Sequence, residues 1–173
     1  MTDLDITNPI ESDKQWSTFG SCQVLLVSAE PWARNVLSLI SQCSEKTIEV
    51  THAIDGAQGL YYMSQSIYSG SPYQLLVLTS PLSQLDPISC IESLRAIERG
   101  LNRPPYPCLL CTPEVNYPTI LTRYPQTLHL RVPNNVQAAS MVAAGILQVI
   151  YTLQAYQKSD DLAQKEHPQI NLS

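Results

Sequence analysis

Thr79 is the side chain whose place in the sequence first suggests chemistry. It follows the apolar run Leu75–Leu78 and precedes Ser80-Pro81, which is typical of a buried parallel strand that ends at a turn. Because α/β proteins place reactive groups and ligands at the carboxyl ends of their strands, we expect the Thr79 hydroxyl at the functional edge of a sheet.

A threonine hydroxyl acts as a nucleophile only when a base activates it. Glu30 also follows an apolar run, so it is the candidate base, or a ligand that holds a metal together with water. In the alternative interpretation Thr79 bonds its own turn and Glu30 favours the positive end of a helix. The sequence predicts no catalytic residue beyond this pair of alternatives.

Cys108 and Cys111 have the C-x-x-C spacing of redox and zinc motifs. They lie in the apolar run YPCLLCTP, which indicates a strand, and residues three apart on a strand point to opposite faces. We therefore expect this pair neither to share a metal nor to form a disulfide. The chain has 5 cysteines without framework spacing, which indicates reduced thiols in the cytoplasm.

The charged residues indicate no nucleic-acid surface, because the formal net charge is −5 and the sequence pI is about 5.0. Arg95, Arg99 and Arg103 are four residues apart on a predicted helix that also carries Glu98, which is typical of a solvated helix face. The 3 histidines form no constellation with a nucleophile, and the 6 glycines form no phosphate-binding loop.

The elements that position these side chains alternate between strand and helix. Apolar runs predict strands at Gln23–Val27, Ile48–Ala53, Leu75–Leu78 with its flanks, Cys108–Thr112 and Thr127–Val132. Helical spacing predicts a helix after four of them, whereas three prolines limit any helix after the fourth strand to one or two turns. This alternation predicts a three-layer α/β sandwich with a five-stranded parallel sheet between helices.

The length of 173 residues suits one domain with two tails. We expect a flexible tail at 1–20, the domain at 21–157 and a second flexible tail at 158–173. The acidic start does not resemble a signal peptide. The last helix is predicted from about Val136 to Tyr156, and its most apolar part, Met141–Tyr151, is shorter than a membrane span. No membrane partner is therefore expected.

From about Cys22 to Tyr156 the chain resembles the receiver domain of bacterial two-component response regulators. The stretches that carry the resemblance are LLVSAEPWARNVL, AIDGAQGL, YQLLVLTSPLSQLDP, CLLCTP and LRVP, in the family's order and spacing. The resemblance implies a CheY-like fold with strand order 2-1-3-4-5, here with a short or broken fourth helix, and a role in signal transduction.

The family's phosphorylation pocket is degenerate in this chain. The resemblance places Ser28 and Ala29 where receivers carry a Mg²⁺-binding carboxylate pair, and Thr79 where they carry the phosphoaccepting aspartate. Val132 takes the place of a lysine that pairs with the phosphoryl group, and Pro133 follows it as in the family.

Thr112 keeps the family's residue type, and Glu30 supplies one nearby acid. Mg²⁺ needs hard oxygen ligands, usually with one or two carboxylates. Each missing charge contact near 4 Å forfeits about 4 kcal/mol at an effective dielectric constant of about 20. The sequence therefore predicts a pseudo-receiver without metal, cofactor or enzymatic activity.

Two surfaces are predicted to bind a protein partner. Tyr117 and Tyr124 lie in the proline-broken fourth segment, where the chain is similar to the pseudo-receivers of cyanobacterial clock proteins, which bind partner proteins and in some cases quinones. Val142, Val149 and Tyr156 recur every seven residues along the last helix. They predict a seam for a homodimer or another partner, with a wide core stripe as the alternative.

Three functions remain open on this basis. The first is a stand-alone pseudo-receiver that acts through a protein partner, such as a signalling or clock component. The second is a response regulator that is still switched by phosphorylation. The third is a sensor whose emptied pocket takes a small apolar ligand such as a quinone.

Overall fold

The computed structural model describes residues 21–44, 47–114 and 123–166, with side chains described as far as Asp160. The predicted tail at 1–20 therefore lies outside the described residues. The strands are β1 (Ser21–Val27), β2 (Thr47–Ala53), β3 (Leu75–Thr79), β4 (Cys108–Thr112) and β5 (Thr127–Arg131). The helices are α1 (Ala33–Cys43), α2 (Gly56–Tyr68), α3 (Pro87–Gly100) and α5 (Ala138–Glu166).

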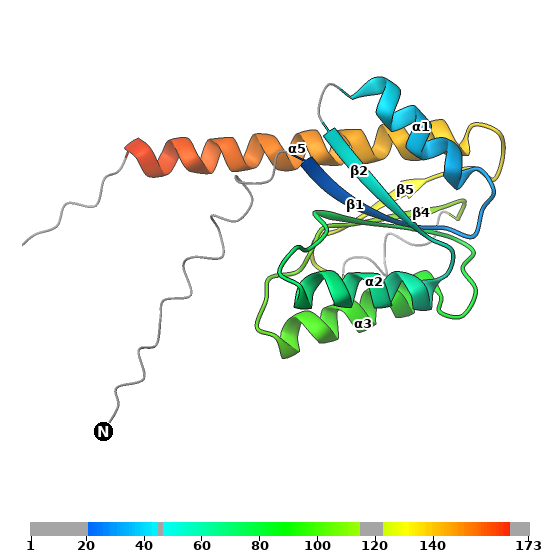
Figure 1. The fold of residues 1–173 in the computed structure, drawn as a ribbon, viewed down its shortest axis with the longest axis horizontal. Coiled ribbons are helices and arrows are strands. Elements are labelled where there is room, and N and C mark those ends of the chain that lie inside the picture. Colours follow the sequence, from blue (N-terminus) through cyan, green and yellow to red (C-terminus); the bar gives the residue numbers. More distant parts are fainter. Residues whose placement is uncertain (1–20, 45–46, 115–122, 167–173) are drawn as a thin grey trace, which may run out of the picture.

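The five strands form one sheet in the order β2-β1-β3-β4-β5, and every neighbouring pair is parallel. Figure 1 shows α1 and α5 on one face of this sheet and α2 and α3 on the other. The predicted three-layer sandwich and its strand order are thus confirmed. The predicted short or broken fourth helix falls mainly on 115–122, which lie outside the described residues.

The central strands are covered on both faces. β3 and β4 are buried at every position, and each reads as a nearly continuous apolar run, as expected of inner parallel strands. The outer strand β5 is only partly covered, and its Leu128 is 54% exposed. Because all neighbouring strands are parallel, their carboxyl ends meet at one edge of the sheet.

Two hydrophobic cores lie on either side of the sheet: the α1/α5 core and the α2/α3 core. Cys111 is buried in the α1/α5 core, and Cys108 is buried in the α2/α3 core. This confirms that the two thiols point to opposite faces of β4. Burial raises the pKa of each thiol to about 12, so both are protonated at neutral pH.

Two of the helix starts are fixed by aspartates. The Asp55 side chain accepts a hydrogen bond from the Gln58 N–H at the start of α2. The Asp86 side chain accepts from two N–H groups at the start of α3, and Pro87 occupies the first turn. By contrast, α1 begins at Ala33 without a side-chain cap. Glu30 lies in the turn that leads into α1, where its carbonyl accepts a hydrogen bond from the Ala33 N–H at 3.1 Å.

The interpretation of Arg95 as part of a solvated face is wrong. Arg95 is only 4% exposed, and its Nη1 lies 2.7 and 2.9 Å from the two carboxylate oxygens of Glu98. Arg95 Nη2 also donates to the Tyr106 carbonyl at 2.9 Å, and Glu98 accepts from the Tyr106 N–H at 2.8 Å. The pair is buried because the chain that leads into β4 packs over this part of α3, whereas Arg99 and Arg103 remain exposed.

α5 differs most from its predicted extent. It begins at Ala138, so Val136 precedes the helix and is 97% exposed rather than packed on the sheet. It continues to Glu166, so residues 158–166 are helical rather than a flexible tail. Figure 1 shows its second half projecting beyond the sheet, past the amino ends of the strands. No proline or glycine interrupts the sequence between Ile146 and Glu166, which explains why the helix continues.

Over Ala138–Asp160, α5 is long and apolar enough to cross a membrane by length and composition. However, 39% of that window is buried inside the protein, and the first half of the helix packs in the α1/α5 core. A core helix of a folded domain passes the same criterion, so the length alone does not indicate a membrane span.

Candidate functional site

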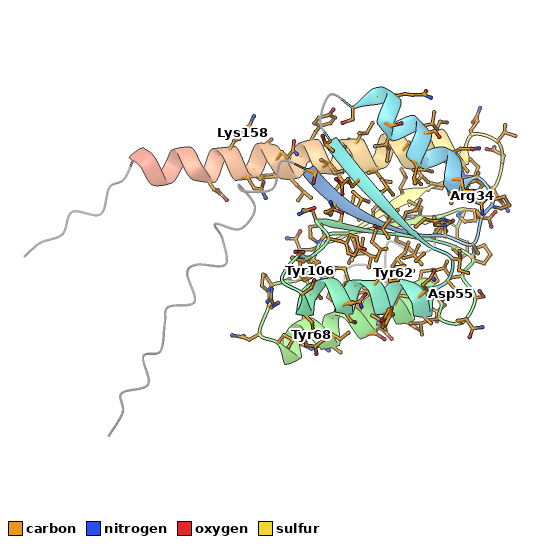
Figure 2. The ribbon with its side chains drawn as sticks, viewed as in Figure 1. Arg34, Asp55, Tyr62, Tyr68, Tyr106 and Lys158 are labelled. Atoms are coloured by element: carbon orange, nitrogen blue, oxygen red, sulfur yellow. The ribbon has the colours of Figure 1, made fainter. Side chains whose placement is uncertain are left out.

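The carboxyl ends of β1, β3, β4 and β5 meet at one end of the sheet, where α2 begins and where the chain turns into α1. In Figure 2 the labelled side chains Arg34 and Asp55 mark this end, and Lys158 marks the opposite one. The residues predicted for the degenerate phosphorylation pocket all lie at this carboxyl edge, but they do not form one cluster.

Ser28 and Thr79 form a buried hydroxyl pair. Ser28 is 0% exposed and Thr79 is 1% exposed, and the Thr79 hydroxyl donates to Ser28 Oγ at 2.8 Å. The Val27 carbonyl is a second acceptor 3.3 Å from Thr79 Oγ1. The bond joins the ends of β1 and β3, so the Thr79 hydroxyl is used to hold neighbouring strands together.

The Ser28 backbone and side chain are also engaged with their surroundings. Ser28 Oγ accepts a hydrogen bond from the Glu30 N–H at 3.2 Å, and the Ser28 N–H donates to the Ala53 carbonyl at 2.9 Å. The Ser28 carbonyl lies 2.9 Å from His52 Nε2. Through these bonds the buried Ser28 connects the end of β1 to β2, to β3 and to the turn that leads into α1.

Glu30 does not activate Thr79 in this arrangement. Thr79 Oγ1 already donates to Ser28 and the Val27 carbonyl, and the bond that links Glu30 to this pair comes from its backbone N–H. Ala29 is exposed and supplies a methyl group. The geometry therefore favours the structural interpretation of Thr79.

A small cavity remains beside the hydroxyl pair. Its volume is about 10 Å³, and its lining includes Glu30, Trp32, Thr79, Val132 and Pro133. Trp32 Nε1 is buried, and among the residues that the structure describes no hydrogen-bond acceptor reaches it. A cavity of this size holds about one water molecule.

Thr112 is set apart from Ser28 and Thr79. It is 0% exposed, and its Oγ1 forms a 2.9 Å hydrogen bond with His129 Nε2 on the neighbouring strand β5. Burial lowers the pKa of the His129 imidazole below its ordinary value. This pair was not among the predicted contacts, although alternation on two adjacent parallel strands places both side chains on the same face of the sheet.

Val132, the residue that the resemblance sets at the lysine position, is buried at the end of β5. It is 5% exposed, and its N–H donates to the Thr112 carbonyl at 2.9 Å. The preceding Arg131 is exposed, and no arginine or lysine lines the cavity among the residues that the structure describes. Within the described ranges, no group of three His, Cys, Asp or Glu side chains comes together as a metal site.

The predicted partner surfaces have mixed outcomes. Tyr117 lies outside the described residues. The Tyr124 ring packs against the α2/α3 core, and its hydroxyl donates to Glu92, which raises the pKa of this phenol. Tyr156 is 68% exposed, but Val142 is 0% exposed in the α1/α5 core, so it is not part of a surface and that prediction is wrong.

Val149 is half-buried beside the same core. The seven-residue spacing therefore joins one core residue, one boundary residue and one surface residue. Seven residues of a straight α-helix make slightly less than two full turns, so positions seven apart drift by about 20° at each step. The three residues therefore do not share one exposed face of α5.

No family model matches the chain, and no curated protein matches it in sequence. Its fold is similar to solved receiver domains. A receiver domain protein of Clostridium thermocellum is 14% identical over 78% of this chain and 98% of its own, with a TM-score of 0.57. The receiver domain of the NarL response regulator of Mycobacterium tuberculosis is 16% identical over 76% and 97%, with a TM-score of 0.55.

The receiver domain of a LuxO repressor protein of Vibrio parahaemolyticus is 16% identical over 83% of this chain and 98% of its own, with a TM-score of 0.56. Sequence identities this low show a shared fold. The function has to be argued from the residues at the site. The predicted resemblance to receiver domains is thus confirmed at the level of the fold.

Proposed function

We propose that this protein is a pseudo-receiver that works in cytoplasmic signal transduction by binding another protein, without phosphorylation of an aspartate. One observation carries the proposal. The position of the phosphoacceptor is occupied by Thr79, whose hydroxyl is buried and bonded to Ser28, the residue that replaces a metal-binding carboxylate.

The charge of the pocket supports this function. Mg²⁺ and a phosphoryl group need carboxylates and a balancing cation close together. Ser28, Ala29 and Val132 supply neither charge, and among the described residues Glu30 is the one acid that lines the cavity. Threonine forms no acyl phosphate. The chain therefore lacks both the phosphoaccepting carboxylate and the charged groups that hold Mg²⁺ and the phosphoryl group in receivers.

The size of the cavity weighs against a ligand sensor. About 10 Å³ holds a water molecule, whereas pockets for small organic ligands measure about 300–1,000 Å³. A quinone would have to displace Trp32 and separate Ser28 from Thr79. Surface recognition is therefore the best-supported mode of action.

Exposed apolar side chains on and after β5 support a protein partner. Leu128 is 54% exposed near the amino end of the outer strand β5, and Val136 is 97% exposed between β5 and α5. An outer strand with an unpaired edge and an exposed leucine is a common place for another chain to bind. A signalling or clock protein would bind to this side of the fold, along β5.

Phosphorylation is tested by incubating the protein with acetyl phosphate and Mg²⁺ and measuring its intact mass. We expect no phosphoryl adduct and no change of melting temperature with Mg²⁺. An adduct that disappears in Thr79→Ala would contradict the proposal, because it would show that the replaced site still accepts phosphate.

Partner binding is tested by affinity capture with the wild-type protein and with Leu128→Lys. Leu101→Lys is the matched control, since Leu101 is also exposed, at 37%, after α3 on the other side of the sheet. A partner retained by Leu101→Lys and lost by Leu128→Lys supports the β5 side. A partner that Leu128→Lys retains excludes this surface.

A further inference from the structure

The outer edge of β5 offers backbone groups to a further strand. In the part of the chain that the structure describes, β5 pairs with β4 alone. The Gln126 carbonyl and the Val132 N–H bond to β4. Because the direction of the backbone groups alternates along a strand, those of Thr127 and Arg131 point to the outer side. Such an edge is a template for another extended segment.

The side chains along this edge call for a segment of particular chemistry. On the α1/α5 side Leu130 packs against the core, and Leu128, two residues away on the same face, is 54% exposed. α5 approaches this side closely, because a Cβ atom at Gly145 would lie 2.7 Å from Leu130 Cδ2. Arg131 is exposed at the carboxyl end of the strand and forms no salt bridge among the described residues. The edge therefore fits a segment that brings an apolar side chain to Leu128 and a carboxylate to Arg131.

Residues 2–7 of the same chain, which lie outside the described residues, read TDLDIT and have that chemistry. Apolar and polar side chains alternate in this sequence, as expected of a strand with one face on a core. The apolar members are Leu4 and Ile6, and the acidic members are Asp3 and Asp5. Asn8-Pro9 follows directly, and proline cannot continue a ladder of paired strands. The pattern therefore has a defined end.

The length of chain between this segment and β1 is sufficient to reach β5. β1 begins at Ser21, and because all strands are parallel, its amino end lies at the same edge of the sheet as Thr127. A strand added outside β5 lies four strand spacings from β1, or about 19 Å. The chain from 8 to 20 can span about 43 Å when extended. Since it arrives at the amino end of β5, residues 2–7 would run antiparallel to β5, which is common for an edge strand of a parallel sheet.

The register of this pairing follows from the two faces of the sheet. With Leu4 and Ile6 on the α1/α5 side, the cross-strand pairs are Thr7–Thr127, Ile6–Leu128, Asp5–His129, Leu4–Leu130 and Asp3–Arg131. Apolar side chains thus meet apolar ones, Asp3 meets the guanidinium of Arg131, and no like charges stand opposite each other. A slip by one residue would turn Leu4 and Ile6 to the other face. We propose that residues 2–7 bind the outer edge of β5 as a sixth, antiparallel strand.

The other outer strand, β2, is a poorer match for this segment. β2 is nearer to β1, but its exposed charged side chain is Glu49, which repels an acidic segment. Its sequence, TIEVTHA, contains no arginine or lysine. The charge of residues 2–7 therefore selects β5.

The added strand would cover Leu128, so a partner that binds along β5 has to displace it. The segment thereby acts as an intramolecular inhibitor of partner binding. This regulatory role rests on the proposed function, whereas the pairing of residues 2–7 with β5 does not.

The first experiment is disulfide trapping in a Cys43→Ser background, because Cys43 is the exposed thiol among the described residues. Ile6→Cys with Leu128→Cys should form an intramolecular disulfide, identified by peptide mass, because opposite residues of an antiparallel pair lie within disulfide distance. The matched control, Ile6→Cys with Glu49→Cys on β2, should react about tenfold more slowly. Equal rates overturn the proposal. Covalent dimers in place of the bridged monomer would show that a second copy supplies the strand, and they also overturn it.

The second experiment follows the amide hydrogen exchange of Thr127 and Arg131 by NMR, with the amides of β2 as the internal reference. Deletion of residues 2–7 should speed exchange at both amides about tenfold and leave β2 unchanged. Asp3→Arg should speed it about threefold, and Asp3→Arg with Arg131→Asp should restore slow exchange. Exchange in β5 that the deletion leaves unchanged overturns the proposal.

Affinity capture separates the regulatory role from the proposed function. The chain without residues 2–7 should retain at least threefold more partner than the full chain. Equal capture by the two chains overturns the inhibitory role. Capture of no partner by either chain contradicts the proposed function, and the disulfide and exchange results still decide whether the sixth strand forms.

Discussion

The carboxyl edge of the sheet and the free half of α5 treat their polar and apolar groups in opposite ways. At the carboxyl edge the hydroxyls of Ser28, Thr79 and Thr112 are fully buried and bonded to protein partners. On α5, by contrast, Tyr151 and Tyr156 are exposed to solvent. The hydroxyls thus close the carboxyl edge, whereas the outward face of α5 leaves its side chains open to water.

This difference has a physical cause. A buried hydroxyl without a partner is unfavourable by about 1–3 kcal/mol, so polar groups that lost a ligand are stable only when they bond each other. An exposed tyrosine carries little penalty, because its ring is half covered by its own helix and its hydroxyl reaches water. Mutations should therefore lower the free energy of unfolding strongly at buried positions and only slightly at exposed ones.

The two faces of α5 should give the largest contrast. Val142→Glu places a carboxylate in the α1/α5 core, so we expect the free energy of unfolding to fall by about 4 kcal/mol or more. Gln148→Glu, on the outward face of the same helix, should change it by less than about 0.5 kcal/mol. Urea unfolding followed by circular dichroism measures both, and equal effects would show that α5 does not pack as described.

Thr79→Asp should be the next most severe change, because it introduces the family's carboxylate into a pocket without a balancing cation. Burial disfavours the charged form, so we expect about 3 kcal/mol of destabilisation at pH 7. The folded-state pKa of the new carboxyl would lie above its unfolded value, so the loss should shrink as the pH falls toward 4. Urea unfolding at several pH values tests this.

Thr79→Val is the control for the size of the side chain. It removes the hydroxyl bond between the ends of β1 and β3 and should lower the free energy of unfolding by about 1–2 kcal/mol at any pH. An aspartate variant as stable as the wild type at pH 7 would mean that water reaches this site, and the closed description of the edge would fail.

His129 should make the β4–β5 side of the edge sensitive to acid. Burial holds its pKa below the ordinary value of 6.5, so the folded state favours the neutral imidazole. The neutral imidazole therefore contributes its full share to the free energy of unfolding above pH 6.5, and that share is lost as the pH falls below this value. Unfolding free energies from pH 8 to pH 5 should therefore decline less in His129→Gln than in the wild type. An identical slope would show that His129 does not titrate with folding.

Tyr156→Lys should have the smallest effect on stability. The ring is 68% exposed and belongs to neither hydrophobic core, so the free energy of unfolding should change by less than about 0.5 kcal/mol. Urea unfolding measures the change. A large loss of stability would mean that the free half of α5 packs on its own domain.

The sheet was predictable because its signals are local. β3 and β4 are uninterrupted apolar runs that end in threonine, and strands that alternate with helices leave few topologies. The edge positions of Ser28, Thr79 and Val132 followed from those strand ends. Their bonding partners did not, because a hydroxyl pair depends on the register between strands that are 51 residues apart in sequence.

Arg95 and α5 were mispredicted for a different reason. A four-residue spacing of arginines does not distinguish a face exposed to water from one covered by a loop. Arg95 is buried because the chain around Tyr106 packs over it and accepts its hydrogen bond. For α5, periodicity indicated where the helix packs, but its end is set by helix propensity, which continues after the apolar residues stop.

The direction of α5 has a consequence for how the molecule can be handled. The helix starts beside the carboxyl ends of the strands and finishes past their amino ends (Figure 1). A label or tether attached to its projecting half therefore lies far from Ser28 and Thr79 and leaves the carboxyl edge accessible.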